Sequence, residues 1–225
     1  MTIPVITVDG PGGAGKGTLS YSLARALGWH MLDSGALYRV TALAALDSGA
    51  DLADEAALAA IAGSLDVSFR PAAEGLTRVE LAGRDISSDI RTESCGAAAS
   101  VVAAVVPVRK ALLERQRRMA QAPGLVADGR DMGTVVFPGA PLKIYLTASA
   151  RARAERRQKQ LLEKGESVTL ARLLETIEER DARDRSRAES PLVPADDALV
   201  IDSTGVSADA VLDTVLREAR QRQLA

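Results

Sequence analysis

Apolar positions along the chain predict strands that alternate with helices. Residues 5–8 form a β-branched run, which is typical of a strand covered on both faces of a sheet. After a glycine-rich stretch, apolar residues recur at positions 19, 23, 26 and 27, the spacing of one helix face. Gly28 then occupies the usual position just past a helix end. The chain therefore opens with a strand, a glycine loop and a helix.

The same patterns continue to the end of the chain. A short apolar strand at 29–32 ends at Asp33, and either Asp33 or Ser34 caps the helix that follows. Pro107 is expected to open a helix at its first turn, and Ser207 to cap the last one. The other predicted helices span 54–65, 94–106, 108–121, 149–164 and 169–187, and three further buried strands span 125–127, 142–146 and 198–201.

Residues 66–85 have a different pattern. Polar and apolar positions alternate there, with breaks at Pro71, Gly75 and Gly83, which predicts a small antiparallel hairpin or meander. It interrupts a chain that otherwise consists of strand-helix pairs. Five strands separated by helices predict an α/β fold with a five-stranded, parallel, doubly wound sheet and an antiparallel β insertion.

Four of these strands end in aspartate, at Asp9, Asp33, Asp128 and Asp202. Such residues either cap the following loops or belong to a site beyond the strand ends.

Composition narrows the class of protein. A chain of 225 residues, 47% hydrophobic, fits one globular domain with an insertion. Cys95 is the single cysteine, which indicates a reducing compartment, and the start of the chain lacks the basic segment of a signal peptide. The longest uncharged run, 94–108, is shorter than the ~20 residues of a membrane span. We therefore expect a soluble, cytoplasmic protein. The net charge of −2 argues against nucleic acid as a partner, and His30, the single histidine, is interpreted as a packing residue.

The glycine loop carries the chemistry. Residues 10–18, here called the phosphate loop, read Gly-Pro-Gly-Gly-Ala-Gly-Lys-Gly-Thr between the predicted strand and helix. A glycine loop between a strand and a helix is the context in which the P-loop motif indicates a nucleotide-phosphate site. In such a site backbone N–H groups encircle an anion, and Lys16 would reach the outer phosphates. The general motif has Ser or Thr directly after the lysine to bind magnesium. Here Gly17 stands in that place, with Thr18 one position later.

Two further stretches fit a site for phosphorylated ligands. Residues 128–131, Asp-Gly-Arg-Asp, follow a buried strand, and the alternative is a salt-bridged structural turn. Arg180, Arg183, Asp184 and Arg187 recur at i, i+3, i+4 and i+7, so a helix would place them on one face. Arginines on one face suit a clamp on transferring phosphates, whereas a solvated face is the alternative, and we assign Asp181 and Arg185 to the solvated side.

These motifs together resemble the bacterial cytidylate kinases, CMP/dCMP kinases of the nucleoside-monophosphate kinase group. The resemblance covers almost the whole chain, including the meander, and the Lys16-Gly17-Thr18 order is the family's own form. It rests on five stretches: residues 10–19, 33–39, 127–138, 180–187 and 191–195. It implies one P-loop kinase domain, 1–225, with a monophosphate-binding insertion at about 34–106 and a short helical lid at about 150–167. The implied reaction is ATP-dependent phosphorylation of CMP and dCMP.

The resemblance also implies roles for individual residues. For ATP, the binding residues would be Gly10, Pro11, Gly12, Gly13, Ala14, Gly15, Lys16, Gly17 and Thr18, with Arg153 and Arg157 of the lid. For CMP, they would be Ser34, Arg39 and Arg130 at the phosphate, Arg109 and Asp131 at the base, Ser100, Arg180 and Asp184 at the sugar, and Arg187 near both phosphates. Lys16, Arg130 and Arg187 would be catalytic. Mg²⁺ would be held through ATP phosphates and water, with Thr18 as the one candidate protein ligand.

Two other classes of function remain open at this stage. One is a kinase of the same fold that acts on UMP, AMP or a non-nucleotide acid. The other is a nucleotide-dependent switch, although the chain lacks an Asn-Lys-x-Asp motif for guanine and its arginine surplus suits two phosphorylated substrates. No long exposed apolar stripe is evident, so we expect a monomer whose ligands are small molecules, with no membrane partner.

Overall fold

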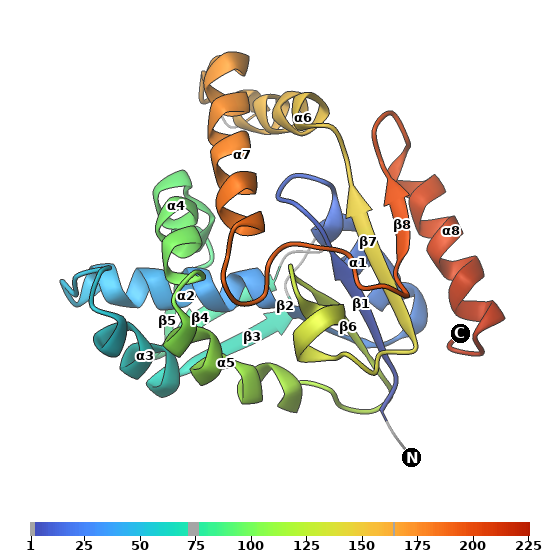
Figure 1. The fold of residues 1–225 in the computed structure, drawn as a ribbon, viewed down its shortest axis with the longest axis horizontal. Helices are drawn as coiled ribbons and strands as arrows, with labels where there is room; N and C mark the ends of the chain where they lie inside the picture. Colours follow the sequence, from blue (N-terminus) through green and yellow to red (C-terminus); the bar gives the residue numbers. More distant parts are fainter. Residues whose placement is uncertain (1–2, 72–76, 164) are drawn as a thin grey trace. The chain divides into compact units, whose positions relative to one another are not determined.

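The computed structural model describes residues 3–71, 77–163 and 165–225 (Figure 1). It contains two compact units. The sheet unit comprises residues 1–32 and 119–225, and the helical unit comprises residues 33–118. The predicted break at Gly75 and the predicted helix end at residue 164 lie outside the described residues.

The sheet unit is built on five strands in the order β2-β6-β1-β7-β8. Strand β1 (Val5–Asp9) lies at the centre, fully buried, and pairs in parallel with β6 (Leu125–Asp128) and β7 (Leu142–Thr147). Strand β8 (Leu199–Asp202) pairs in parallel with β7 at one edge, and β2 (His30–Asp33) is the other edge. The predicted five-stranded parallel sheet and its four aspartate strand ends are confirmed.

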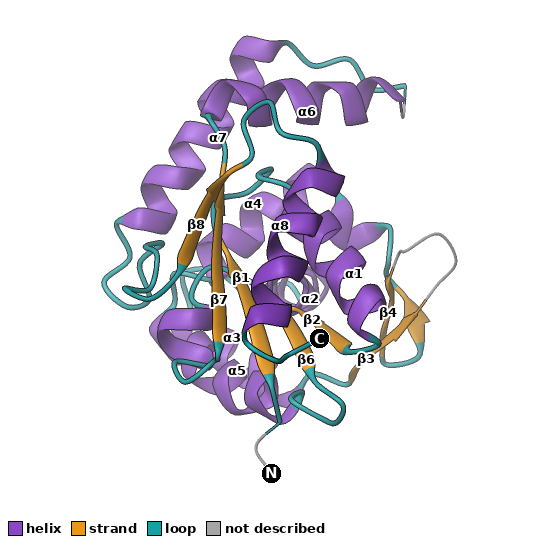
Figure 2. Ribbon diagram, turned by 90° about the vertical axis from the view of Figure 1, so that its right-hand side faces the viewer, coloured by secondary structure: helices purple, strands orange, loops and turns teal. Residues whose placement is uncertain are grey.

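Helices cover the sheet through apolar faces. Helix α1 (Lys16–Leu27) and helix α8 (Ala208–Gln221) lie on the same side of the sheet, where Leu23 and Val215 join Ile6 in one core (Figure 2). Gly28 ends α1 with a φ of 65°, and Ser207 caps α8 by accepting from the N–H of Ala210 at 3.2 Å, as predicted. Helices α6 (Ala150–Glu163) and α7 (Leu170–Arg185) pack together around a smaller apolar cluster of Ala154, Leu161 and Leu173.

Two expectations for the sheet edges are wrong. Strand β8 is not buried, because it is an edge strand with alternate residues exposed, and Val200 is 56% exposed. His30 is not a packing residue either. Its side chain is exposed on edge strand β2, and its ring hydrogen-bonds to the carbonyl oxygen of Ala122 at 3.0 Å.

The described residues of the helical unit form four α-helices and the predicted antiparallel insertion. The helices are α2 (Ser34–Asp47), α3 (Glu55–Ser64), α4 (Glu93–Val102) and α5 (Val106–Arg118), with a 3-10 turn at Asp89–Arg91, and the strands are β3 (Val67–Pro71), β4 (Thr77–Leu81) and β5 (Arg84–Asp85). Helix α2 packs against α4, and α3 against α5. Asp33, not Ser34, caps α2 by accepting from the N–H of Ala36 at 3.0 Å.

The predicted boundaries of α4 and α5 need correction. Helix α4 ends at Val102 instead of 106, and α5 begins at Val106 and ends at Arg118 instead of 121. Pro107 has no N–H to donate, so a helix tolerates it only in its first turn. Helix α4 must therefore end before Pro107, and a new helix begins at Val106. Across the described ranges no single helix is long and apolar enough to cross a membrane. Taken together, α4 and α5 have the length and composition of a membrane span, but they are bent by 100° at the break between them.

Candidate functional site

The phosphate loop follows β1 and requires its glycines. Gly10 has a φ of +143°, and a Cβ there would lie 2.0 Å from the carbonyl oxygen of Leu146 in β7. Gly13 and Gly15 also have positive φ, of 79° and 99°, a region that L side chains rarely adopt. Helix α1 then begins at Lys16. The loop therefore turns tightly from the central strand into a helix N-terminus, as its sequence predicts.

Side-chain donors hold the carbonyl groups of the loop. Lys16 Nζ donates to Pro11 O at 3.0 Å, Arg153 Nη1 to Gly12 O at 3.0 Å, and Ser203 Oγ to Ala14 O at 2.9 Å. In a trans peptide the C=O and the next N–H point in opposite directions. The N–H groups that follow these three carbonyls thus point away from the donors. The three contacts fix the peptide planes of the loop, and N–H groups of a glycine loop are the donors that such a loop offers to an anion.

Lys16 is a buried cation among other charges. Its side chain is 6% exposed, and Nζ lies 3.9 Å from a carboxylate oxygen of Asp128 at the end of β6. Burial, together with the positive charges of Arg130 and Arg180, lowers the pKa of Lys16 to about 8, although the negative charge of Asp128 opposes the shift. A polyanion beside Lys16 would relieve this repulsion.

Two of the predicted arginines lie at the tip of the loop. A Cβ on Gly12 would lie 3.5 Å from Nη2 of Arg130 and 3.7 Å from Nη1 of Arg180. Arg130 follows strand β6 and Arg180 lies in α7, so the fold brings the two predicted motifs together. Arg130 and Arg180 therefore join Lys16 and Arg153 at the phosphate loop.

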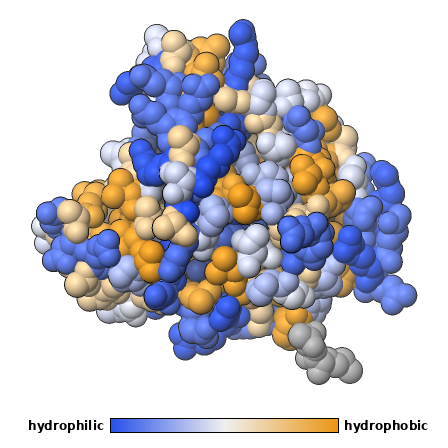
Figure 3. All heavy atoms as spheres, in the orientation of Figure 1, coloured by the Kyte–Doolittle hydropathy of each residue, from blue (hydrophilic) through white to orange (hydrophobic). Residues whose placement is uncertain are grey.

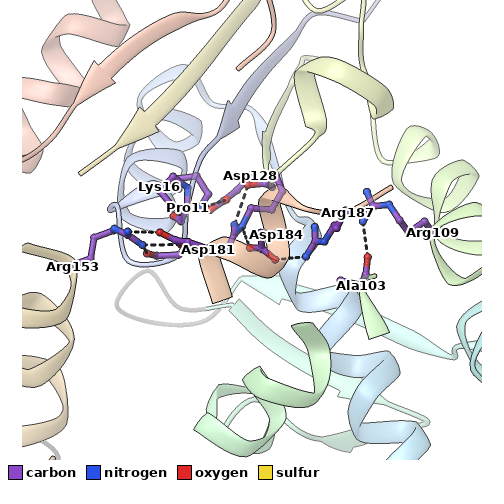
Figure 4. A network of polar contacts seen from close by, with 12 residues as sticks. Pro11, Lys16, Ala103, Arg109, Asp128, Arg153, Asp181, Asp184 and Arg187 are labelled. Atoms are coloured by element: carbon purple, nitrogen blue, oxygen red, sulfur yellow. Dashed lines mark hydrogen bonds and ion pairs between the residues drawn. The ribbon is translucent and has the colours of Figure 1, made fainter. Parts of the chain in front are cut away.

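Asp184 organises the arginines from inside α7 (Figure 4). Its side chain, 2% exposed, accepts from Arg130 Nε at 3.1 Å and from Arg187 Nη2. Burial alone would raise the pKa of Asp184, but the positive charges of Arg130, Arg187 and Arg180 hold it below its usual value. The carboxylate stays ionised and keeps these guanidinium groups in place.

The predicted arrangement of four residues on one helix face is wrong in two respects. Helix α7 ends at Arg185, so Arg187 lies beyond it and reaches back to Asp184. Arg183 is exposed, and Figure 3 shows a mostly hydrophilic surface over α7. The interpretation of Asp181 as a solvated residue is also wrong, because its side chain is buried and paired with Arg153.

Asp9 fixes the turn that carries Asp131. Its two carboxylate oxygens accept from the N–H groups of Met132 at 2.8 Å and Gly133 at 2.7 Å, at the start of a π-helical turn (Met132–Val136). Burial raises the pKa of Asp9 to about 6, although these two hydrogen bonds oppose the shift. This role of Asp9 was not predicted. The one feature of the sequence that could have indicated it is the position of Asp9 at the end of the strand that precedes the phosphate loop.

The helical unit holds four more of the predicted residues. Ser34 is buried and donates to Oε1 of Gln116 at 2.6 Å, and Ser100 is buried in α4. Arg39 donates to Ile90 O at 2.5 Å.

Arg109, at 8% exposure, donates to Ala103 O at 3.1 Å, and its guanidinium lies 5.5 Å from the ring centre of Tyr38. Arg109 is thus no surface residue of α5. Gln116 was not among the predicted residues, because only the fold shows its contact with Ser34.

The lid arginines have different environments. Arg153 is buried and contacts the phosphate loop, whereas Arg157 donates to Gln160 Oε1 at 3.3 Å in the same helix. Arg156, which was not predicted, donates to Ser203 O at 2.5 Å and to Ala14 O at 3.4 Å. Both Arg153 and Arg156 therefore hold loop carbonyls.

The oxygen donors beside the loop are few. In the part of the chain that the structure describes, no three His, Cys, Asp or Glu side chains gather as a metal site. Asp128 lies next to the start of α1, since a Cβ on Gly17 would be 3.8 Å from its Oδ2, and Thr18, which follows Gly17 in the helix, is exposed. One carboxylate and one hydroxyl fit Mg²⁺, which keeps several waters and takes ligand phosphates.

Comparisons with known proteins agree with this geometry. The family model described as cytidylate kinase matches residues 6–221. A cytidylate kinase of Aeromonas hydrophila is 61% identical over 219 residues, which cover 97% of this chain and 95% of that protein. Cytidylate kinases of Klebsiella pneumoniae and Salmonella paratyphi B are 58% and 59% identical, with 98% and 97% of this chain and 96% of each relative covered. The chain belongs to the cytidylate kinase family.

Proposed function

We propose that the protein transfers the γ-phosphoryl group of ATP to CMP or dCMP, giving ADP and CDP or dCDP. The observation that carries this proposal is the meeting of Lys16, Arg130 and Arg180 at the phosphate loop. Two phosphorylated substrates would supply the negative charge that this cluster of cations needs. Family membership supports the choice of acceptor.

Each substrate takes its own set of residues in this proposal. ATP phosphates bind residues 10–18, and Arg153 and Arg157 contact the rest of ATP. The acceptor phosphate binds Ser34, Arg39 and Arg130, with Arg187 near both phosphates. Arg109 and Asp131 bind the base, and Ser100, Arg180 and Asp184 bind the sugar. Arg109, Asp131 and Asp184 are buried polar side chains, and binding sites use a small number of such groups to fix the orientation of a ligand.

The chemical step needs no covalent intermediate. An oxygen of the CMP phosphate attacks the γ-phosphorus of ATP, the bond to the β-phosphate oxygen breaks, and ADP leaves with the electron pair. Lys16, Arg130 and Arg187 neutralise the charge that spreads over the transferring group, and the loop fixes its position. Mg²⁺, held through ATP phosphates and water with Asp128 and Thr18 beside it, would supply further neutralisation of phosphate charge.

The proposal extends to organisation and location. Residues 1–225 act as one kinase domain with a monophosphate-binding insertion at about 34–106, most of the helical unit, and a lid at about 150–167. We propose a cytoplasmic monomer with small-molecule substrates. The single cysteine, Cys95, and the use of ATP favour that compartment.

The test is ADP formation from ATP with CMP, dCMP, UMP and AMP as acceptors, with the diphosphate product identified by chromatography. We expect CMP and dCMP to give a much higher kcat/KM than UMP and AMP. ADP formation that does not depend on a monophosphate, or that is fastest with AMP, would reject the proposal.

A further inference from the structure

Asp181 has no place among the proposed substrate contacts, yet its side chain is buried within α7. It is 4% exposed, whereas Glu178 and Glu179, one turn earlier on the same helix, are exposed. A buried carboxylate is strongly unfavourable unless a partner compensates its charge. The partner of Asp181 therefore indicates why the residue is there.

That partner is Arg153 in the first turn of α6. Arg153 Nη1 donates to Oδ1 of Asp181 at 3.1 Å, and Nη2 donates to Oδ2 at 2.5 Å (Figure 4). The Arg153 side chain is itself only 3% exposed. Two parallel hydrogen bonds between a planar guanidinium and a carboxylate fix the orientation of both groups. Asp181 thus sets the position of the Arg153 guanidinium.

The remaining contacts of Arg153 reach the phosphate loop. Nε donates to Ala148 O at 3.0 Å, and Nη1 donates to Gly12 O at 3.0 Å. The aliphatic part of the side chain lies against the loop as well, since a Cβ on Gly13 would be 3.2 Å from Cβ of Arg153. Of the five N–H groups of an arginine, these contacts leave one for a direct contact with ATP.

We propose that Asp181 is a positioning residue for the phosphate loop. Through Arg153 it holds the Gly12 carbonyl, and so the peptide plane that contains the Gly13 N–H, in the orientation that receives nucleotide phosphate. The inference rests on the proposed role of the loop in binding ATP. Asp184, three residues along α7, holds Arg130 and Arg187, so one helix orders the donor loop through Asp181 and the acceptor arginines through Asp184.

The direct test compares Asp181→Asn with Glu178→Gln, which removes an exposed carboxylate from the same helix. Calorimetry measures the Kd of each variant for ADP and, separately, for CMP. We expect Asp181→Asn to weaken ADP binding about tenfold, the scale of coupling between contacting residues, while CMP binding stays close to wild type. Glu178→Gln should match the wild type for both ligands. Unchanged ADP binding in Asp181→Asn, or equal weakening of both ligands, would overturn the proposal.

A second variant addresses the unpaired buried charge that Asp181→Asn leaves on Arg153. Arg153→Met combined with Asp181→Leu removes both charges, and replacing a buried pair by apolar groups is often tolerated. We expect this double variant to fold and to show the same weakening of ADP binding. Wild-type ADP affinity in the folded double variant would overturn the positioning role of Asp181 and would leave the proposed function unaffected. Absence of CMP-dependent ADP formation in the wild-type protein would instead reject the proposed function.

Discussion

The carboxylate of Asp9 accepts a hydrogen bond of 2.7 Å from the N–H of Gly133, which lies 124 residues further along the chain. This contact joins the end of the strand before the phosphate loop to the turn that carries Asp131. The approach is possible because residue 133 has no side chain. A Cβ there would lie 2.9 Å from Oγ1 of Thr7 and 3.1 Å from Cδ of Lys143.

Gly133→Ala should therefore destabilise the fold and disturb the turn. Overpacking of this kind costs about 1–3 kcal/mol, and a urea titration would measure the loss as a lower unfolding midpoint with an unchanged slope. Gly139→Ala serves as the control, because a Cβ at Gly139 would meet nothing within 4 Å. Equal stability of the two variants would show that the close approach of Gly133 has no energetic consequence.

Asp9 should also give the stability of the protein a specific pH dependence. Its pKa is about 6 in the folded state against 3.8 for the ordinary side chain. Between these values the folded protein holds a proton that the unfolded chain has lost, so unfolding becomes easier as the pH rises. The contribution is complete below pH 3.8 and is lost as the pH rises through 6, and the shift corresponds to about 3 kcal/mol.

Urea unfolding of wild type and Asp9→Asn between pH 4 and pH 8 would measure this effect. The difference in unfolding free energy between the two proteins should change with pH, since the variant lacks the titrating group. Asp9→Asn also alters a hydrogen bond, so the slope of the difference is the relevant quantity, not its absolute value. A difference independent of pH would show that Asp9 does not titrate in this range.

Lys16 should make nucleotide binding sensitive to alkaline pH. Its pKa of about 8 in the free protein means that a rise from pH 7 to pH 9 removes most of its charge. A bound polyphosphate favours the charged form, so binding must take up a proton at the higher pH and ADP affinity should fall. Calorimetric titrations of ADP at several pH values would show this, and Lys16→Met should remove the dependence attributed to this residue.

The same variant tests the catalytic role of Lys16. Removal of one preorganised charge from a site of charge development typically lowers turnover by about 10²- to 10³-fold, and we expect at least that for Lys16→Met. Circular dichroism would establish that the variant folds. Near-wild-type kcat in a folded variant would exclude Lys16 from the catalytic step.

Local patterns were sufficient to predict the strands, the phosphate loop and the antiparallel insertion. Each depends on periodicity, glycine or turn residues within a short stretch, and each is present in the structure. The burial of Asp181 could not be predicted, because its helix alternates in charge and its partner, Arg153, lies in a different helix. The contact of Asp9 with Gly133 could not be predicted either, because 124 positions separate the two residues in the sequence. The exposed face of β8 depends on which strand occupies the sheet edge, which its own residues do not specify.

Closure over the substrates is a separate expectation. Arginines gathered around the phosphate loop repel one another when no anion is bound, which favours an open form, and transfer requires that water be excluded. A two-substrate analogue should slow hydrogen exchange in both 34–106 and 150–167. Exchange that is unchanged in both segments would contradict closure.

The choice of base should depend on Asp131. Cytosine presents an amino donor at N4 beside acceptors at N3 and O2, whereas uracil presents an acceptor at O4 beside an N3–H donor. A carboxylate can only accept and a guanidinium can only donate. In the proposed assignment, Asp131 facing N4 and Arg109 facing N3 and O2 satisfy cytosine. Uracil would place O4 against the buried carboxylate of Asp131.

An unpaired buried polar group costs about 1–3 kcal/mol, and more when it is charged, so we expect CMP to be preferred over UMP by about 10- to 1000-fold in kcat/KM. Asp131→Ala should collapse this ratio, mainly through loss of CMP activity, while the KM for ATP changes little. Asp131→Asn is the sharper variant, because the side-chain amide can donate to O4 of uracil as well as accept from N4 of cytosine. It should therefore raise UMP activity in absolute terms. If both folded variants keep the wild-type ratio, residues other than Asp131 and Arg109 distinguish the two bases.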